Sequence, residues 1–232
     1  MAELEPQNPE QTPLITIKEI KPTPEEFEQT VDEMFELHQK AYGEHSLTTR
    51  EQMRERLTER PADTLNIGVY IRNKLVGDIG ITTGTKDWLG SWYLFGLATD
   101  PSQQGKGMGD ILLKEVLRRA EKYQTCVATA RPNNYGSIAL FVNNNNFRVT
   151  QFLPNHFGPG QHRVLMEISP QIRNMQFDLD LIRISSNDID ALNEKLNNGY
   201  VGVGVERSQK VTGDSTKEET FLLLRKLRRV ER

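Results

Sequence analysis

The sequence predicts a mixed α/β fold, and three observations predict it. Between residues 14 and 169, short runs with the two-residue period of strands alternate with stripes of helical period. In the middle of that region, an apolar strand at 92–99 runs into a glycine-rich turn, which opens a helix at Met108. Residues 170–232 repeat the strand and helix patterns on a smaller scale. We therefore expect an α/β domain at 14–169 and a C-terminal β-α-β-β extension at 170–232.

The composition sets broad limits on the class of protein. The 232 residues are 36% hydrophobic with a net charge of −3, and mean hydropathy is −0.59. These values predict a soluble protein without a nucleic-acid surface, and no apolar run approaches the ~18 residues of a membrane span. A single cysteine, Cys126, excludes an intramolecular disulfide and is typical of a cytoplasmic protein. Residues 1–13 are rich in Glu, Gln and Pro, and we expect a disordered tail there, not a signal peptide.

The first predicted elements are a strand at 14–20 and a helix that starts at Thr23. Thr23 has the residue type of an N-cap, Pro24 suits the first helical position, and two glutamates follow. The apolar stripe of this helix consists of Phe27, Val31, Met34, Phe35 and His38. A second helix begins at Thr48 or Thr49 and ends before Pro61, and strands at 65–71 and 75–83 form a hairpin with a turn at Asn73–Lys74.

The remaining elements follow the same logic. The helix that begins at Met108 buries Met108, Ile111, Leu112, Val116 and Ala120. The strands that complete the domain are expected at 125–130, 149–152 and 163–168, with one helix after the first. In the extension we expect a strand at 177–184, a helix capped by Ser185 or Ser186 and ended by Gly199, a strand at 200–205, a polar loop, and a strand at 220–224.

The glycine-rich turn predicts an anion site. Gly105, Gly107 and Gly109 remove side chains at alternate positions, so backbone N–H groups can converge on one anion beside the positive end of the helix dipole. The turn is not a P-loop, because Gly107 stands where Ser or Thr would follow Lys106. It is not a Rossmann fingerprint either. That motif requires a third glycine three residues after the second, where this chain has Asp110, and an acidic residue about 20 positions further on, where residues 125–130 contain none. We interpret it as a pyrophosphate cradle.

The turn resembles the acetyl-CoA motif of the GCN5-related N-acetyltransferase (GNAT) superfamily, Gln/Arg-x-x-Gly-x-Gly/Ala, through Gln104, Gly107 and Gly109. The stretch from Asn134 to Phe141, followed by Asn146-Phe147, is similar to the family's Asn-x-x-Ala/Ser-x-x-x-Tyr and Gly-Phe. The resemblance covers roughly residues 14–169, and the predicted element order agrees with it. It implies a central sheet that splays apart between the strand at 92–99 and the strand at 125–130.

The resemblance implies an N-acetyltransferase that moves acetyl from acetyl-CoA to a primary amine of an unidentified acceptor. Two alternatives remain: a non-catalytic acyl-CoA sensor, or a structural role in which the extension is the interaction surface. Leu97, Ala98 and Thr99 would pair their backbone with the pantetheine arm as an added strand. The residues implied to hold the pyrophosphate are Gln104, Gly105, Lys106, Gly107, Met108, Gly109 and Asp110. Lys106 would add charge there, or it is a solvated side chain.

The second motif implies three further cofactor contacts. Asn134 would bond to the pantetheine arm, although Asn is also a common N-cap. Ser137 would lie close to the cofactor, or it is a small residue at a tight packing position. Phe141 would pack against the thioester end, where the family usually has the tyrosine that protonates the departing thiolate. The loss need not stop catalysis, because a thiol pKa of about 8.5 makes the CoA thiolate a fair leaving group.

The general base is less defined. Some family members carry a glutamate on the strand before the cradle, but 91–99 contains no carboxylate, and Tyr93 occupies the matching position. Tyr93 would orient a substrate or a water, or it packs in the half-open sheet. Candidates from elsewhere are His38, Glu44, His45, Asp87 and His156. His38 lies on an apolar stripe and is expected to be a satisfied core histidine, so Tyr93, Glu44 and His156 form the catalytic hypothesis.

The extension predicts an interaction. Its predicted helix carries an apolar stripe of Ile189, Leu192 and Leu196, and apolar strands lie beside it. Together they carry more apolar surface than so short a segment can bury alone. We expect it to dock on the first domain or to form a homodimer interface. The expected partners are therefore acetyl-CoA, an amine acceptor and either the same chain or a second copy; no metal, nucleic acid or membrane is expected.

Overall fold

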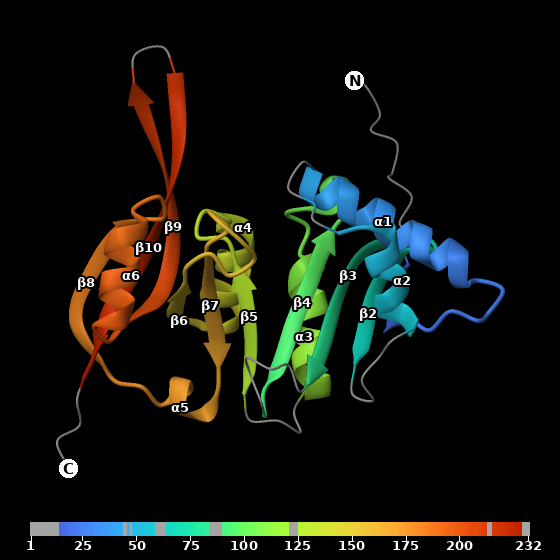
Figure 1. Ribbon diagram of the computed structural model, residues 1–232, viewed down its shortest axis with the longest axis horizontal. Helices are drawn as coiled ribbons and strands as arrows, with labels where there is room; N and C mark the ends of the chain where they lie inside the picture. Colours follow the sequence, from blue (N-terminus) through green and yellow to red (C-terminus); the bar gives the residue numbers. More distant parts are fainter. Residues whose placement is uncertain are drawn as a thin grey trace, which may run out of the picture. The chain divides into compact units, whose positions relative to one another are not determined.

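The computed structural model describes residues 14–43, 46, 48–58, 64–83, 90–120, 125–212 and 215–228 (Figure 1). It has the mixed α/β architecture predicted from the sequence. The chain divides into two compact units, and the division cuts through two strands and one helix. Unit 1 takes its described residues from 1–60, 65–79 and 96–112, and unit 2 from 61–64, 80–95 and 113–232. The domain boundary expected near residue 169 stays a prediction.

Unit 1 is a small sheet with helices packed on it. Its strands are β1 (Ile15–Glu19), β2 (Leu65–Ile71), the first part of β3 (Lys74–Thr83) and the last part of β4 (Trp92–Thr99), in the order β1-β2-β3-β4. Its helices are α1 (Phe27–Tyr42), α2 (Arg50–Thr58) and the start of α3 (Met108–Arg119). A 3-10 helix, η2 (Pro101–Gln103), follows β4. One buried core joins helices and strands: Ile20, Val31, Met34, Leu37, Met53, Leu57, Leu75 and Ala98.

The hydrogen bonds expected of a cap at Thr23 are present, but α1 begins later than predicted, at Phe27, with Glu26 as its N-cap residue. The Glu26 N–H donates to Thr23 Oγ1 at 3.4 Å, and the Thr23 N–H donates to Glu26 Oε2 at 3.2 Å. This reciprocal pair is a capping box, and the regular helix continues from Phe27. The β2–β3 turn, in contrast, lies one residue earlier than predicted, because Arg72 (φ 51°) and Asn73 (φ 66°) hold the left-handed conformations that a two-residue hairpin requires.

Unit 2 contains the rest of β3, β4 and α3 and all later elements. Its further strands are β5 (Cys126–Ala130), β6 (Arg148–Leu153), β7 (Arg163–Ile168), β8 (Phe177–Ser185), β9 (Tyr200–Thr212) and β10 (Ser215–Leu227), in the order β4-β5-β7-β6-β9-β10-β8. The helices are α4 (Tyr135–Ile138), which continues into a π-helical segment at 139–144, α5 (Pro170–Arg173) and α6 (Ile189–Asn197). The parallel register of β4 with β5 covers Trp92–Leu94, a short pairing that agrees with the expected splay.

The extension docks on its own chain, which is one of the two arrangements expected. Strand β9 continues the sheet beyond β6, with Gly202 opposite Val149 (Figure 1). The Asn143 side chain donates to the Val205 carbonyl at 3.0 Å and accepts from the Val205 N–H at 3.1 Å. Leu192 and Leu196 of α6 are buried. Two residues of the apolar stripe are therefore covered within unit 2, and the third, Ile189, is half-buried.

Two local predictions in the extension are wrong. The stretch expected to be a polar loop forms a long two-stranded ribbon, paired out to Thr212 opposite Ser215 (Figure 1). The sequence of this stretch is mostly polar, so it contains no apolar alternation to detect. Helix α6 is capped by Asp188, whose Oδ1 accepts from the Ala191 N–H at 3.1 Å, while the Ser185 hydroxyl donates to Glu219 on β10 at 2.7 Å.

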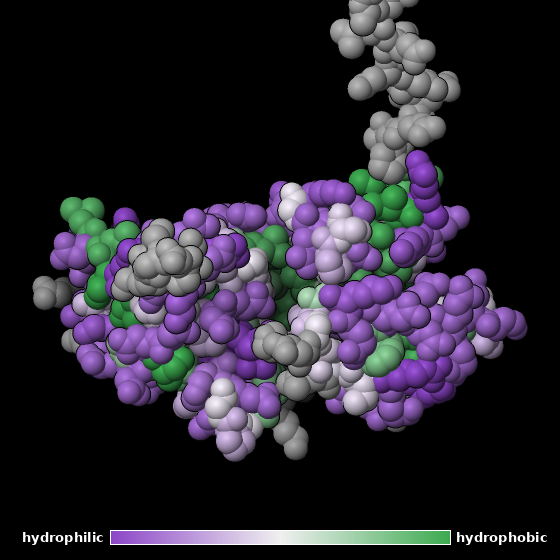
Figure 2. Space-filling model, turned by 90° about the horizontal axis from the view of Figure 1, so that it is seen from above, coloured by the Kyte–Doolittle hydropathy of each residue, from purple (hydrophilic) through white to green (hydrophobic). Residues whose placement is uncertain are grey.

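The face drawn in Figure 2 is mostly hydrophilic, with scattered hydrophobic areas. The large hydrophobic side chains that are exposed among the described residues are Leu14, Ile15, Ile17, Phe157, Leu179 and Leu181. Of the helices that the structure describes, none combines the length and apolar character needed to cross a bilayer. The described part of the chain contains no cluster of three His, Cys, Asp or Glu side chains placed to bind a metal.

Gly202→Ala is expected to lower the free energy of unfolding by about 1–3 kcal/mol, the usual cost of overpacking. A Cβ at Gly202 would lie 2.6 Å from Val149 Cβ, and both residues belong to paired strands. Gly204→Ala is the control, because its Cβ would first meet Leu223 Cδ1, the end of a flexible side chain, at 3.3 Å. Thermal denaturation should show a large decrease in Tm for Gly202→Ala and a small one for Gly204→Ala. Equal Tm values would contradict the close β6–β9 junction.

Candidate functional site

The cradle predicted from the sequence lies in unit 1, after the end of β4. The Asp100 N–H donates to the Val76 carbonyl at 2.8 Å, which ties this end of β4 to β3. The Asp100 carboxylate accepts from the Ser102 hydroxyl and N–H at 2.6 and 2.9 Å and so closes η2. These hydrogen bonds lower the pKa of Asp100, so the carboxylate that shapes the turn stays ionised. The loop is therefore held in place by hydrogen bonds of Asp100 to Ser102 and to β3.

The glycines of the turn have the conformations that the motif requires. Gly105 (φ +75°) and Gly107 (φ +81°) are left-handed and exposed. A Cβ at either position would meet no described atom within 4 Å, so the surface above the turn is open. The first helical hydrogen bond of α3 runs from the Ile111 N–H to the Gly107 carbonyl at 3.0 Å. The N–H groups of the first turn of a helix have no acceptor inside the helix, which suits an anion.

The last residues of β4 present their polar groups to both edges of the strand. Because Asp100 bonds to β3, the alternation of a strand directs the backbone polar groups of Leu97 and Thr99 to the opposite edge. Side chains engage the carbonyls there: Gln104 Nε2 donates to the Thr99 carbonyl at 3.4 Å, and the Tyr42 hydroxyl donates to the Leu97 carbonyl at 2.5 Å. Sequence reasoning missed Tyr42, because its partner is 55 residues away.

A buried charged network lies beneath this part of β4. His38 Nε2 is 2.8 Å from Asp78 Oδ1, and Arg56 Nη2 is 2.7 Å from Asp78 Oδ2. Arg56 Nε also donates to Asn66 Oδ1 at 2.6 Å. The Asp78 side chain is fully buried, and burial alone would raise its pKa, but the electrostatic interactions and hydrogen bonds with Arg56 and His38 outweigh burial and lower it. His38 therefore lies in the core, as its position on the stripe predicted, but the expectation of a fully satisfied ring is only half met: Nε2 has its partner in Asp78, while the buried Nδ1 has none among the described residues.

Gly96 connects the network to the strand. Its φ is +60°, and a Cβ there would lie 2.8 Å from Arg56 Nη1 and 3.3 Å from His38 Cε1. Glycine is therefore required both for the left-handed backbone and for the close approach of the two side chains. Gly96 immediately precedes Leu97, so the network supports the residue to which Tyr42 bonds. An isolated glycine inside a strand pattern was the one available signal for this contact.

The predicted catalytic residues do not form one described cluster. Tyr93, in unit 2, places its hydroxyl 3.3 Å from Thr129 Oγ1 and stacks on Phe95 with ring centroids 6.1 Å apart. His156 is half-buried in the turn after β6 and contacts the Phe157 ring at 4.5 Å. Glu44, His45 and Asp87 lie outside the described residues. None of these contacts tests a catalytic role, so the roles of Tyr93 and His156 stay predictions.

The second motif lies in unit 2. Asn134 Oδ1 accepts from the Ser137 N–H at 3.1 Å, so Asn134 does cap α4. Phe141 is buried and meets Phe147 edge to face at 5.0 Å. Asn146 takes φ +61° where the family usually has glycine, as the tolerance of Asn for this region predicts. The cofactor contacts of Asn134, Ser137 and Phe141 stay predictions.

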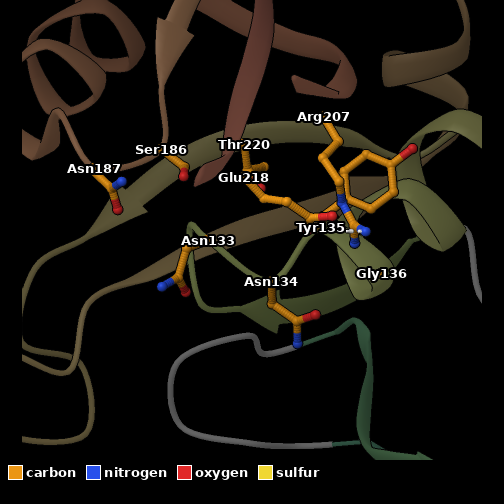
Figure 3. Close-up of a pocket in the computed structure, with 9 residues that line it drawn as sticks. All are labelled: Asn133, Asn134, Tyr135, Gly136, Ser186, Asn187, Arg207, Glu218 and Thr220. Carbon is orange, nitrogen blue, oxygen red and sulfur yellow. Dashed lines mark ion pairs between the residues drawn. The ribbon is translucent and has the colours of Figure 1, made fainter. Parts of the chain in front are cut away.

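A polar cleft adjoins the start of α4, and the extension supplies half of it (Figure 3). Its volume is about 370 Å³. Arg207 forms an ion pair with Glu218 at 3.2 Å and lies 4.5 Å from the centre of the Tyr135 ring, so the ribbon and α4 are tied together. The lining residues are Asn133, Asn134, Tyr135, Gly136, Ser186, Asn187, Arg207, Glu218 and Thr220.

Comparison with known proteins gives consistent results. The model of the acetyltransferase (GNAT) family matches residues 31–147, which is half of the chain. No functionally curated protein matches it significantly. The ribosomal-protein-S18-alanine N-acetyltransferase of Escherichia coli is similar in structure, with a TM-score of 0.55 and 18% identity over 67% of this chain and 94% of that one.

Two further solved structures share the fold. An N-acetyltransferase of Staphylococcus aureus Mu50 has a TM-score of 0.54 and 16% identity, covering 67% of this chain and 98% of that one. An aminoglycoside 6'-N-acetyltransferase in complex with coenzyme A has a TM-score of 0.51 and 15% identity, covering 66% and 96%. At these identities the likeness shows the fold.

Proposed function

Because the chain belongs to the GNAT acetyltransferase family, we propose that it is an N-acetyltransferase that moves acetyl from acetyl-CoA to a primary amine. The observation that carries the proposal is the open turn from Gln104 to Asp110. Its left-handed glycines at 105 and 107 and the start of α3 offer backbone N–H groups to a pyrophosphate.

The chain would contribute binding and orientation to a direct transfer. Acetyl-CoA would supply the activated acyl group. The amides at 105–110 would hold the pyrophosphate, and the backbone of Leu97 and Thr99 would align the pantetheine arm. An acyl-enzyme at Cys126 is disfavoured, because burial raises the pKa of that thiol to about 11 and leaves little thiolate. A buried free thiol also suits the proposed cytoplasmic location.

A non-catalytic acyl-CoA sensor is the second candidate, and Phe141 is the observation that favours it. Its buried ring cannot donate a proton where the family usually has a tyrosine. One pair of measurements separates the two functions. Acetyl-CoA binding is read from the rise in Tm, because a ligand that binds only the folded state raises the free energy of unfolding by RT ln(1 + [L]/Kd). Turnover is read from CoA release with a panel of amines.

The panel should contain a polyamine, an aminoglycoside, a lysine peptide and a peptide with an N-terminal alanine. The aminoglycoside and the alanine peptide represent the substrates named for two structural neighbours. We expect acetyl-CoA to raise Tm and CoA release to depend on one class of amine. Binding without release by any amine would favour the sensor. No rise in Tm at millimolar acetyl-CoA would contradict both functions.

A further inference from the structure

Tyr42 places a phenol at the edge of β4 that faces away from β3. Its hydroxyl donates to the Leu97 carbonyl at 2.5 Å, and both residues belong to unit 1. Leu97 is one of the residues proposed to pair with the pantetheine arm. The proposed function thus puts the ligand along the edge that Tyr42 already reaches.

The direction of β4 decides which end of the ligand Tyr42 would meet. The pyrophosphate cradle follows Thr99, so an arm aligned along the strand runs from Thr99 back toward Leu97. Each residue of a strand advances about 3.3 Å. The thiol is at the end of the arm remote from the pyrophosphate, so the thioester comes to the Leu97 side. A hydroxyl held at the Leu97 carbonyl therefore stands at the reacting end.

The phenol is held in place by the buried network. Tyr42 lies one helical turn after His38, and the two ring centroids are 5.5 Å apart. His38 and Arg56 both approach Gly96, the residue before Leu97, and Asp78 pairs with both of them. The same network of His38, Arg56 and Asp78 therefore supports both α1, which carries Tyr42, and the peptide group to which its hydroxyl bonds. Such support keeps a functional group in position.

We infer that Tyr42 is a catalytic residue of the proposed acetyl transfer and supplies the proton that Phe141 cannot. The amine nitrogen bonds to the acyl carbon, the C–S bond breaks with its electron pair on sulfur, and the Tyr42 O–H proton passes to that sulfur. The phenolate then recovers a proton from the acylated nitrogen, directly or through water. The products are the amide and CoA thiol.

Tyr42→Phe tests the inference in the full-length chain with the amine that the panel identifies. We expect kcat for CoA release to fall roughly 10²-fold at pH 7, the low end for general acid catalysis. The deficit should shrink above about pH 8.5, where free thiolate is stable without a proton. Among the described residues, His38 contacts the Tyr42 ring and Asp78 pairs with both His38 and Arg56, and all three are unchanged in the variant. A deficit of equal size at every pH would indicate a structural role and overturn the inference.

Tyr70→Phe is the matched control. Tyr70 is a second phenol that packs on the core of unit 1, and burial, with smaller effects of nearby carboxylates, raises its pKa to about 12. Its loss should change neither kcat nor the pH profile. A pH-dependent deficit in Tyr70→Phe as large as that of Tyr42→Phe would overturn the assignment to Tyr42.

A second measurement needs no acceptor. Calorimetry compares the binding of CoA and of desulfo-CoA, which lacks the sulfur. Wild type should prefer CoA by about 2- to 10-fold, the size of one hydrogen bond, and Tyr42→Phe should lose that preference. An unchanged preference in the variant overturns the inference while the proposed function stands. Failure of the wild type to bind either compound overturns both.

Discussion

Gly107→Asp is expected to abolish the stabilisation of this protein by acetyl-CoA. The substitution puts a carboxylate into the open space above the turn, where the pyrophosphate is proposed to bind. Two like charges 4 Å apart repel by about 4 kcal/mol at an effective dielectric constant of 20. That energy corresponds to roughly a 10³-fold weaker Kd. Thermal denaturation with and without acetyl-CoA measures the effect as the loss of the ligand-dependent rise in Tm.

Gly199→Asp is a closely matched control for backbone strain. Gly199 has φ +80° against +81° at Gly107, and a Cβ there would also meet no described atom within 4 Å. It lies at the end of α6, in the extension. Both variants should lose similar stability without ligand, and Gly199→Asp should keep the full response to acetyl-CoA. A normal response in Gly107→Asp would contradict the cradle.

Asp78→Asn is expected to have the largest effect on stability. The side chain of Arg56 is 8% exposed, and the substitution would remove the buried carboxylate with which it forms an ion pair. Breaking a buried ion pair by removing one partner costs about 3–5 kcal/mol. Urea denaturation should show this as a decrease in the midpoint. Glu28→Gln, which removes an exposed partner of Arg50 and Arg54, should change the midpoint little.

The pH dependence of the same variant tests the charge of Asp78. The network lowers the pKa of Asp78 in the folded protein below its ordinary value of 3.8. The carboxylate therefore stabilises the fold at pH values above 3.8, and this stabilisation is lost as the pH falls through 3.8 toward the lower folded-state value. The difference in unfolding free energy between wild type and Asp78→Asn should narrow over that interval. If the difference in unfolding free energy between the two proteins stays constant until acid unfolding, the charge of the Asp78 carboxylate does not stabilise the fold.

The sequence determined the elements whose causes are local. Trp92–Thr99 and Arg163–Ile168 have the predicted bounds, because a run of apolar residues ended by turn residues specifies a strand without distant partners. The conformation of the glycine-rich turn was equally predictable, since glycine permits the left-handed φ values at 105 and 107 whatever surrounds them. The ribbon from β9 to β10 was not, because cross-strand pairing, and not hydrophobic period, defines it.

Only the tertiary structure decided which side chains meet. His38 contacts Asp78 across 40 residues and Arg56 across 18, and Tyr42 reaches Leu97 across 55. Nothing in the spacing of these residues predicts the contacts, because they depend on how α1 and α2 pack on the strands. His38 could be expected to lie in the core, since helical period assigns a face. The carboxylate that accepts from it, and the carbonyl that Tyr42 holds one turn later, are set by packing between segments far apart in the chain.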